Sequence, residues 1–530
     1  MREDLAAGLR FFAGLPAFLR HPLTSAGAHM IVRRRLEHRD ADFLALARRT
    51  IYDQPSSPYR KLLEWAGCDY GDLERLVAGD GVEGALRRLA GQGVYLTVDE
   101  FKGRRPVRRG GRAIAAGPAL LRNPGSTFHA PVQSSGSRGT STPVPLDLAF
   151  VREDAVDRLL FLEAEGTIQG SHAVWGVPGS AAMGHVLRFA ACGLVMRRWF
   201  SQLDPADPGL HPRYRWSARA MSWGGRLAGV RLPRPEHAPL ENPLVIASWM
   251  RTVRRQGRLP RLMTYASSAA RLGQAVWTAG QDLEGARIEI SGEPVTPARL
   301  AAVRRVGAEA SFHYGSSEVG CHIGYGCLGS WQGGDLHLLH DLVAVVQPGA
   351  DAPGIGLPSD ALLFTSLRST TPFVLLNVSI GDRARLVARS CGCPLDRLGW
   401  TTHLQGVESF EKLTAGGMNL LDVDAARILD DELPRRFGGW PGDYQLVEEA
   451  TGEVDQPVLR LRVHPRLGPL DADAVREAFL AAVERVCDAA RVIASVWRSG
   501  RLLQVERVPP LPTPAGKILH LHRLSRGGSA

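Results

Sequence analysis

The sequence predicts an α/β fold, in which a large N-terminal domain with mainly parallel sheets and helices is followed by a small α+β domain. Three observations lead to this prediction. A length of 530 residues is enough for about three domains of ordinary size. Strand-like and helix-like stretches alternate from about residue 150 to about residue 380, as they do in a parallel sheet covered by helices. Beyond about residue 405, the order of elements is that of a compact split βαβ unit.

Residues 1–100 are predicted to be the helical part of the large domain. Apolar side chains recur at helical spacing in 41–52, in 58–67 and, with glycine interruptions, in 71–93. Proline and glycine then become frequent in 104–132, which is typical of a connecting segment.

Residues 101–405 are predicted to form the core of the large domain. Thr296 is expected to cap a helix over 296–307. Strands are expected at 244–250, 287–291, 308–315, 361–367 and 372–378. Ligands of a parallel sheet bind at the carboxyl ends of its strands, so the turns SGEP and YGSSE are expected to converge.

Residues 406–530 are predicted to be the small α+β domain. An amphipathic helix is expected over 471–490, because Val475, Phe479 and Val483 lie on one stripe. Strands are expected at 444–450, 458–464, 492–498 and 502–508. Lys517 follows a Pro-Thr-Pro-Ala-Gly turn and is expected to project from it, although an ordinary exposed lysine is the simpler interpretation.

The composition argues against several classes of protein. The net charge is +10 and the pI about 9.5, which favours polyanionic partners such as nucleotides. The two densest basic stretches, 102–112 and 251–261, contain no aromatic residues for base stacking, so nucleic acid is not an expected partner. No run of about 18 apolar residues occurs, so no integral membrane segment is expected.

Cysteine usage predicts the compartment. Seven cysteines, an odd number, occur without a visible secretory signal, which indicates reduced thiols and a cytoplasmic protein. The amphipathic first twenty residues leave open a helix that lies on a membrane surface. The sequence does not indicate the oligomeric state, and a homodimer stays open.

One stretch, 311–327, combines several kinds of chemistry. Tyr314 offers an aromatic plane, Gly315 allows a close approach of the backbone to a ligand, and hydroxyls including that of Ser317 precede the carboxylate of Glu318. This combination suits a purine nucleotide with its metal ion. The same residue types also make an ordinary turn after a core strand, so the local sequence leaves both interpretations open.

A second loop, 134–143, contains two glycines and six hydroxyl residues. Successive backbone N–H groups and hydroxyls at such a turn can surround phosphate oxygens. A flexible linker has a similar composition, but an ordered helical pattern follows directly in 145–166. Further along the chain, Asp382 follows a predicted strand, where it could accept hydrogen bonds from a ribose or simply form an Asx turn.

In this order, SSGSRGTSTP, SGEP, YGSSE, IGD and PTPAGKI resemble the motifs of the adenylate-forming ligases, specifically of their phenylacetate–CoA ligase-like branch. The resemblance covers most of the chain from about residue 40 onward. It implies that ATP activates a carboxylic acid, aromatic or otherwise hydrophobic, as an acyl-adenylate with release of pyrophosphate, and that CoA then accepts the acyl group. It also implies that the small domain is mobile and rotates between the two half-reactions.

The resemblance implies a role for each matching residue. Lys517 and Glu318 would be catalytic, with the lysine bridging the carboxylate and the α-phosphate, and Glu318 holding Mg²⁺. Ser317 would face the α-phosphate, Tyr314 would stack on adenine and Asp382 would bind the ribose. The loop around the ATP phosphates would be Ser134, Ser135, Gly136, Ser137, Arg138, Gly139 and Thr140. The residues around adenine and ribose would be Gly292, Glu293, Pro294, His313, Tyr314, Gly315, Ser317 and Asp382.

The sequence departs from the family pattern at two places. Arg138-Gly139-Thr140 replaces the usual Thr-Gly-Lys of the phosphate loop. The hinge, 406–412, lacks the arginine that usually helps to bind the nucleotide, and Arg397 is a candidate substitute. The acceptor is therefore open: an amine, a carrier-protein thiol or a protein side chain could replace CoA. A nucleotide-binding relative without activity is a further alternative.

A zinc site is also predicted. Cys391-Gly-Cys393 is a two-sulfur knuckle, and with Cys327 and His337 it makes a Cys₃His set that suits tetrahedral Zn²⁺. The resemblance supports the prediction, because some members of the branch carry a zinc knuckle near this position. Idle buried thiols are the alternative. Rival ligands are Cys321, His322 and His340.

Overall fold

A large mixed sheet forms the centre of the large domain, and it has 12 strands within the part of the chain that the structure describes. The computed structural model describes residues 2–133, 143–177, 180–207, 212–329, 334–349, 356–410, 413–415, 418–420, 422–449, 458–486, 488–499 and 502–524. In spatial order the strands are β13 (Val343–Val346), β14 (Ala361–Ser366), β15 (Val378–Ala388), β16 (Thr402–Ser409), β12 (Asp335–Leu338), β11 (Cys321–Gly326), β10 (Glu309–Ser316), β9 (Arg287–Ser291), β8 (Pro260–Tyr265), β5 (Ser171–Gly176), β6 (Arg198–Ser201) and β7 (Pro235–His237).

The sheet changes direction at β10. From β10 to β7 every neighbouring pair is parallel, and from β10 to β13 every pair is antiparallel. The predicted parallel α/β sheet is therefore confirmed for one half, and the other half is antiparallel. The end of β10 carries Tyr314 to Ser316, so this stretch lies at the junction of the two halves.

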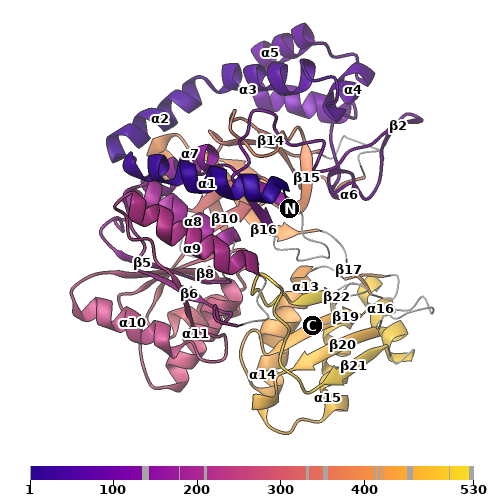
Figure 1. Ribbon diagram of the computed structural model, residues 1–530. Helices are drawn as coiled ribbons and strands as arrows, with labels where there is room; N and C mark the ends of the chain where they lie inside the picture. Colours follow the sequence, from indigo (N-terminus) through magenta and orange to yellow (C-terminus); the bar gives the residue numbers. More distant parts are fainter. Residues whose placement is uncertain are drawn as a thin grey trace.

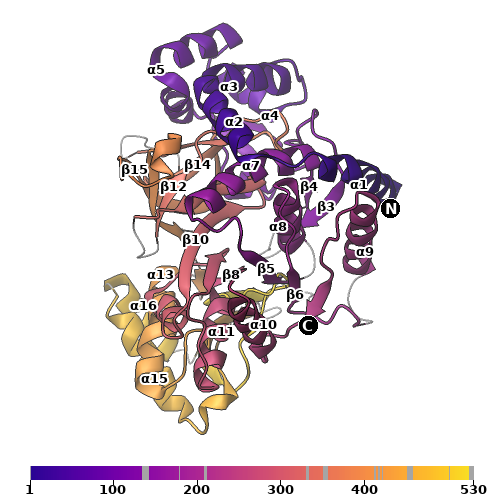
Figure 2. The ribbon, with the colours of Figure 1, turned by 90° about the vertical axis from the view of Figure 1, so that its left-hand side faces the viewer.

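Helices cover the parallel half of the sheet (Figure 2). They are α7 (Leu148–Ala164), α8 (Ser180–Ala191), α9 (Pro212–Leu227), α10 (Leu244–Arg255), α11 (Ala266–Thr278) and α12 (Pro297–Arg304). As predicted, Thr296 caps α12, with its side chain accepting a hydrogen bond from the backbone N–H of Arg299. This cap fixes where the helix begins after the SGEP turn.

The first hundred residues are mainly helical, as predicted. The helices are α1 (Arg2–Arg20), α2 (Ser25–Glu37), α3 (Arg39–Ala47), α4 (Pro58–Trp65), α5 (Tyr70–Gly91) and α6 (Val98–Phe101). Of these, α2 to α5 lie at the top of the molecule in Figure 1, and α1 crosses its middle. These helices share one apolar core with the sheet. The Asn377 side-chain amide also joins them to the sheet, because it donates to Leu86 O and Val94 O.

Two short antiparallel pairs follow α6. They are β1 (Val107–Arg109) with β2 (Arg112–Ile114), and β3 (Ala130–Gln133) with β4 (Pro143–Leu146). The predicted phosphate loop, Ser134 to Thr140, lies outside the described residues, between β3 and β4 in the sequence. In the described ranges, no helix is both long and apolar enough to cross a membrane.

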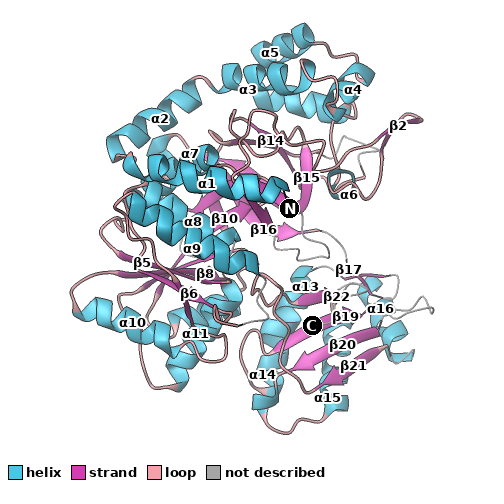
Figure 3. Ribbon diagram, viewed as in Figure 1, coloured by secondary structure: helices cyan, strands magenta, loops and turns pink. Residues whose placement is uncertain are grey.

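The small domain has its own sheet and its own apolar core (Figure 3). The sheet order is β21 (Leu503–Glu506), β20 (Val458–Val463), β19 (Tyr444–Glu449) and β22 (Leu521–Leu524). The other elements are β17 (Leu413–Ala415), β18 (Met418–Leu420), α13 (Asp422–Arg427), α14 (Leu433–Phe437), α15 (Ala472–Glu484) and α16 (Asp488–Ser499). Val475, Phe479 and Val483 of α15 are all buried, as their spacing predicted.

Three predicted strands are wrong. Residues 244–250 begin helix α10, and 492–498 belong to helix α16. The segment 372–377 is irregular, and β15 starts only at Val378. Asn377 has a φ of 52°, a left-handed conformation that interrupts an extended chain. Asp382 consequently lies inside β15 and not in a turn after a strand.

Candidate functional site

Tyr314 and Asp382 meet although their strands are not neighbours. The Tyr314 hydroxyl donates a hydrogen bond of 2.6 Å to Asp382 Oδ2. Their strands, β10 and β15, are four strand spacings apart in the sheet, which is about 19 Å if the sheet were flat. Two side chains cannot span that distance, so the antiparallel half of the sheet must curl back. This curl brings the predicted adenine-stacking ring and ribose-binding carboxylate to one place.

The turn after Tyr314 is held by its own side chains. Ser316 Oγ donates to Glu318 Oε2 at 3.0 Å and accepts from the Glu318 backbone N–H at 3.2 Å. Gly320, with φ of +88°, ends the turn where a Cβ would lie 3.0 Å from Phe150. Glu318 stays half-buried, so its carboxylate is fixed in place while part of it is open to a ligand.

The SGEP turn is fixed from inside the large domain. Glu293 is buried, and its carboxylate accepts hydrogen bonds from Ser267 N at 2.6 Å and from Ser267 Oγ at 2.9 Å. Arg299 NH1 donates to Glu293 Oε2 at 3.2 Å. Protein groups therefore engage both oxygens of Glu293. The predicted adenine contacts of Gly292, Glu293 and Pro294 stay a prediction.

Lys517 of the small domain lies against this turn. Its Nζ is 5.3 Å from the centre of the Tyr265 ring, at the end of β8. A Cβ at Gly292 would lie 3.2 Å from Lys517 Cε, so glycine is the residue that leaves room for the lysine. Thr513 holds the base of the lysine turn, because its Oγ1 accepts from Lys517 N at 3.1 Å. The ends of β8, β9 and β10 share one edge of the sheet, which is the edge that Lys517 reaches.

His313 lies on the other face of β10 from Tyr314, because successive side chains of a strand point to opposite faces. Its Nδ1 contacts Glu289 Oε1, and its ring packs against those of His185 and His322. Burial lowers the pKa of all three imidazoles, in the case of His322 to about 3. His313 therefore does not join Tyr314 and Asp382. His313 packs instead with His185 and His322 in a cluster of imidazoles.

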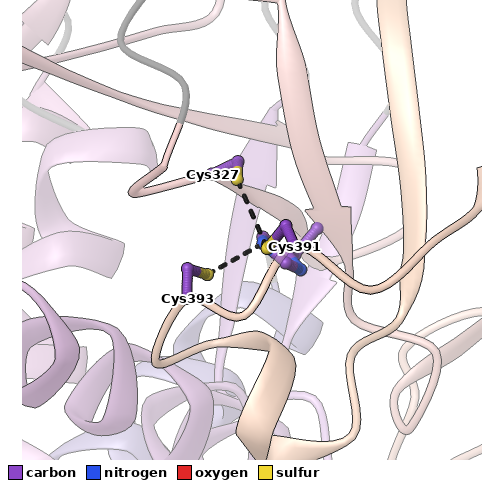
Figure 4. Close-up of side chains that lie close together, drawn as sticks. Cys327, Cys391 and Cys393 are labelled. Carbon is purple, nitrogen blue, oxygen red and sulfur yellow. Dashed lines mark hydrogen bonds between the residues drawn. The ribbon is translucent and has the colours of Figure 1, made fainter.

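The four predicted zinc ligands come together (Figure 4). Their ligand atoms all lie within 4.8 Å of one another. Cys327 Sγ is 3.7 Å from Cys391 Sγ, and His337 Nε2 is 3.5 Å from Cys391 Sγ and 3.2 Å from Cys393 Sγ. Zn–S bonds of about 2.3 Å in a tetrahedron place two sulfurs about 3.8 Å apart, so this set fits Zn²⁺.

Backbone groups around the four predicted zinc ligands hold them in position. His337 Nδ1 is 2.6 Å from Trp400 O, so Nδ1 carries the proton and Nε2 presents its lone pair to the sulfurs. Gly392, between the two cysteines, has a φ of +72° and makes the knuckle turn possible. The rival ligand His322 is bound to Asp154 and Arg158 instead.

Arg397, the candidate substitute for the missing hinge arginine, contacts the cysteine knuckle, and its role toward a nucleotide stays a prediction. Arg397 NH1 donates to Gly392 O at 3.4 Å, beside the cysteine knuckle. The predicted hinge, 406–412, begins in β16, where Glu408 forms an ion pair of 3.1 Å with Arg383 of β15. Arg383 directly follows Asp382, and it is the described cation nearest to that residue in sequence.

Sequence reasoning missed Tyr265 and Arg299. Tyr265 gave no signal, because an aromatic residue at a strand end is common. Arg299 did give one: it occupies the first turn of a helix, where the helix dipole disfavours a cation. A buried arginine at that position requires acidic partners, and Glu293 is one of them.

Comparisons with known proteins agree with this geometry. No family model matches the sequence, and no curated protein matches it significantly. Among solved structures, the chain is similar to 2-hydroxyisobutyryl-CoA ligase in the postadenylation state with 2-HIB-AMP, at 16% identity over 92% of this chain and 90% of that chain, with a TM-score of 0.52. It also matches O-succinylbenzoate coenzyme A synthetase from Bacillus subtilis with ATP and magnesium (12% identity, 76% and 70% of the two chains, TM-score 0.42). An amide bond synthetase from Marinactinospora thermotolerans matches as well (13% identity, 77% and 69%, TM-score 0.39).

The likeness to 2-hydroxyisobutyryl-CoA ligase covers both domains and shows the fold. The chain therefore shares the fold of that adenylate-bound ligase, and the prediction of the two-domain α/β fold is confirmed. The phenylacetate–CoA ligase-like branch stays a prediction.

Proposed function

We propose that this protein is an adenylate-forming ligase that activates a carboxylic acid with ATP and then transfers the acyl group to CoA. The observation that carries the proposal is the position of Lys517. A lysine from the small domain reaches the edge of the large sheet where β8, β9 and β10 end, next to Gly292 and Tyr265. The end of the neighbouring strand β10 carries the Tyr314–Asp382 pair. A fold shared with an enzyme crystallised with an acyl-adenylate supports the same function.

In the first half-reaction, a carboxylate oxygen of the acid attacks the α-phosphorus of ATP. The new C–O–P bond forms as the bond to the β-phosphate oxygen breaks, and pyrophosphate leaves. Negative charge develops on oxygens around the α-phosphorus, and the Lys517 ammonium is positioned to stabilise it. Tyr314 would orient the adenine and Asp382 the ribose, which places the α-phosphorus for attack.

Glu318 is the residue that would hold Mg²⁺. Its carboxylate is half-buried and fixed by Ser316, and a hard oxygen ligand of this kind suits the ion. When bound, Mg²⁺ would neutralise charge on the ATP phosphates. Ser134 to Thr140 would surround the β- and γ-phosphates.

In the second half-reaction, a nucleophile attacks the acyl carbonyl and AMP leaves. CoA is the acceptor that we propose first, with its thiol sulfur forming the new bond. The altered hinge keeps an amine, a carrier-protein thiol or a protein side chain as alternative acceptors. We propose an aromatic or otherwise hydrophobic acid.

The test is a panel of aromatic, aliphatic and hydroxy acids with ATP and Mg²⁺, in which pyrophosphate release is measured with and without CoA. Turnover that requires CoA supports acyl-CoA synthesis. Adenylate that forms in a single turnover, and that only hydroxylamine or an amine discharges, indicates another acceptor. A complete lack of release, together with absence of ATP binding by calorimetry, would contradict the proposal.

We also propose that Cys327, His337, Cys391 and Cys393 hold a structural Zn²⁺. The support is the Cys₃His geometry and the Trp400 carbonyl that orients His337. The ion would join β11 and β12 to the segment after β15, behind the nucleotide end of the sheet. Metal analysis should find about one zinc per chain.

A matched pair of variants tests the zinc proposal. Cys393→Ser should lose the metal and lower the melting temperature by several degrees, because structural zinc contributes folding free energy. Cys192→Ser, which alters a buried thiol bound to Ala155 O, should keep the metal. A full complement of zinc in Cys393→Ser would contradict the assigned ligand set.

A further inference from the structure

Arg299 contacts three separate parts of the molecule at the domain interface. It lies in the first turn of α12 and is 1% exposed. NH1 donates to Glu293 Oε2 of the SGEP turn at 3.2 Å, and NH2 donates to Ile518 O, the residue after Lys517, at 3.3 Å. Nε lies 2.9 Å from Asp430 Oδ2 of the small domain. One guanidinium group of the large domain therefore contacts the SGEP turn of its own domain and, in the small domain, both the Lys517 turn and Asp430.

A second contact holds the same turn. The backbone N–H of Ile518 donates to Ser267 Oγ at 3.3 Å, and Ser267 Oγ in turn donates to Glu293. The backbone N–H and the backbone C=O of Ile518 are thus both hydrogen-bonded to the large domain. Because Ile518 directly follows Lys517, these contacts set the direction in which Lys517 leaves the turn.

Asp430 is the small-domain partner, and it is shared. Besides Arg299 it accepts hydrogen bonds from Thr296 Oγ1 at 2.9 Å and Gly442 N at 3.2 Å, and it lies 2.7 Å from His520 Nε2. Burial alone raises the pKa of Asp430, but Arg299 and His520 outweigh it and hold the pKa well below its ordinary value. The carboxylate is therefore charged while the domains are docked.

The contact can also separate at little electrostatic cost. Arg299 and Glu293 both belong to the large domain, and Asp430 and His520 both belong to the small one. If the small domain moves away, Arg299 keeps Glu293 and Asp430 keeps His520. The guanidinium group and both carboxylates then keep a partner from their own domain, so no charge stays buried without one, which is the costly outcome for a broken ion pair.

We propose that Arg299 is a positioning residue that holds the Lys517 turn in the geometry for adenylation, an inference that rests on the proposed function. Arg299 acts through Ile518 and Asp430 and does not itself touch the reacting atoms. A displacement of about 1 Å at a catalytic group can cost about 10²-fold in rate. The effect should fall on adenylation, because the second half-reaction does not use Lys517.

Arg305 supplies a matched control. It follows the same helix, and its guanidinium lies 5.1 Å from the ring of Trp277 in the large domain and 5.1 Å from that of Trp440 in the small domain. Arg305 therefore also crosses the interface, but it contacts neither the SGEP turn nor the Lys517 turn in the described contacts. If Arg299 only helped to hold the two domains together, its substitution should change the two reaction steps in the same way as substitution of Arg305.

The experiment compares Arg299→Met, Arg299→Lys and Arg305→Met in the full chain. Adenylation is measured as pyrophosphate release, and the second step as thioester formation from supplied acyl-adenylate and CoA. Arg299→Met should lower kcat for adenylation about 10²-fold with little change in the KM for ATP, and should leave the second step unchanged or faster. Arg299→Lys, which keeps the charge without the fork, should lose less. Arg305→Met should stay near wild type in both steps.

Equal losses in both steps, or a similar loss in Arg305→Met, would overturn the proposal. Hydrogen exchange followed by mass spectrometry gives a readout that needs no substrate. Amides in 511–520 should exchange at least about tenfold faster in Arg299→Met, with the core strands unchanged. Unchanged exchange there would also refute the inference. Absence of adenylation by the wild-type protein would refute the proposed function instead, so the two failures are distinguishable.

Discussion

Two of the buried groups of charges in the described part of the chain differ in what they connect. In the first, Arg158, Arg261 and Glu289 lie wholly inside the large domain. In the second, Arg299 and Asp430 face each other across the two domains. Side chains in both groups are almost fully buried. The same kinds of side chain therefore form a permanent contact inside one domain and a contact between domains that the proposed domain movement would break.

The permanent group depends mainly on one shared carboxylate, that of Glu289. Arg158 NH1 donates to both oxygens of Glu289, at 2.7 and 2.8 Å, and Arg261 NH1 lies 2.7 Å from the same carboxylate. One acid thus serves two guanidinium groups and the His313 ring. At the interface, by contrast, each domain supplies one acid and one base of its own. Separation there leaves two pairs, whereas removal of Glu289 leaves Arg158 without its carboxylate partner and Arg261 with Glu165 alone.

The largest expected effect follows from breaking the permanent group. Glu289→Gln removes the charge with little change in volume, and it should lower the free energy of unfolding by about 3–5 kcal/mol. Urea denaturation measures this loss. Glu309→Gln, which alters an exposed ion pair with Arg287 on the next strand, should change stability by less than about 1 kcal/mol. Similar losses in both variants would erase the distinction between the two groups.

Lys517→Ala tests the interface side and should remove catalysis without affecting folding. Loss of one group that stabilises developing charge costs about 10²–10³-fold in rate. Single-turnover adenylation should fall by this factor, while ATP affinity by calorimetry and the unfolding midpoint should stay near wild type. An unchanged adenylation rate would refute the role assigned to Lys517.

Gly516→Ala should displace the lysine without removing it. Gly516 has a φ of +82°, and a Cβ there would overlap Gln202 Oε1 and lie 2.9 Å from Val177 Cγ2. The turn must therefore move away from the large domain, and adenylation should fall about 10–10²-fold. The double variant Gly516→Ala/Gln202→Ala should recover part of the rate, because it removes the nearer obstacle. A normal rate in Gly516→Ala would mean that the docked turn is not the adenylating one.

The stability of the protein should depend on pH through His322, which contacts Arg158 of the permanent group. His322 has a pKa of about 3 in the folded protein, mainly because of burial, against an ordinary value of 6.5. Between these values the unfolded chain binds a proton that the folded chain does not, so stability is full above pH 6.5 and falls as the pH falls. The slope is up to about 1.4 kcal/mol per pH unit. His322→Gln should reduce the slope of the urea-unfolding free energy between pH 7 and 5 by up to this amount, and His185 and His313, whose pKa values burial also lowers, should keep the remaining slope.

Tyr314→Phe is the mildest perturbation, because it keeps the ring and removes only the hydroxyl that binds Asp382. A single hydrogen bond contributes about 1 kcal/mol, so the KM for ATP should rise about fivefold with a small change in kcat. Steady-state kinetics at saturating acid measures this. A large drop in kcat would show that the hydroxyl does more than hold Asp382 in place.

Local sequence was sufficient for some elements and insufficient for others. Thr296 was a correct cap because a cap depends on a few adjacent residues. The strands expected at 244–250 and 492–498 were wrong because a short apolar run fits a buried strand and a buried helix equally well. In α10 the burial of Ile246, Met250 and Val253 shows the helical spacing, which becomes visible only beyond the apolar run.

The sequence by itself was enough to predict the side chains of the proposed sites: an aromatic ring and an acid for a nucleotide, a terminal lysine, and three thiols with an imidazole. The order of the motifs was enough to predict the adenylate-forming fold. Which residues meet was decided only by the tertiary structure. The curl of the sheet joins Tyr314 to Asp382, strand alternation turns His313 away from them, and domain docking brings Arg299 to Ile518. The physical reason is that residue type and local periodicity are properties of adjacent residues, whereas curvature and docking depend on contacts between segments far apart in the chain.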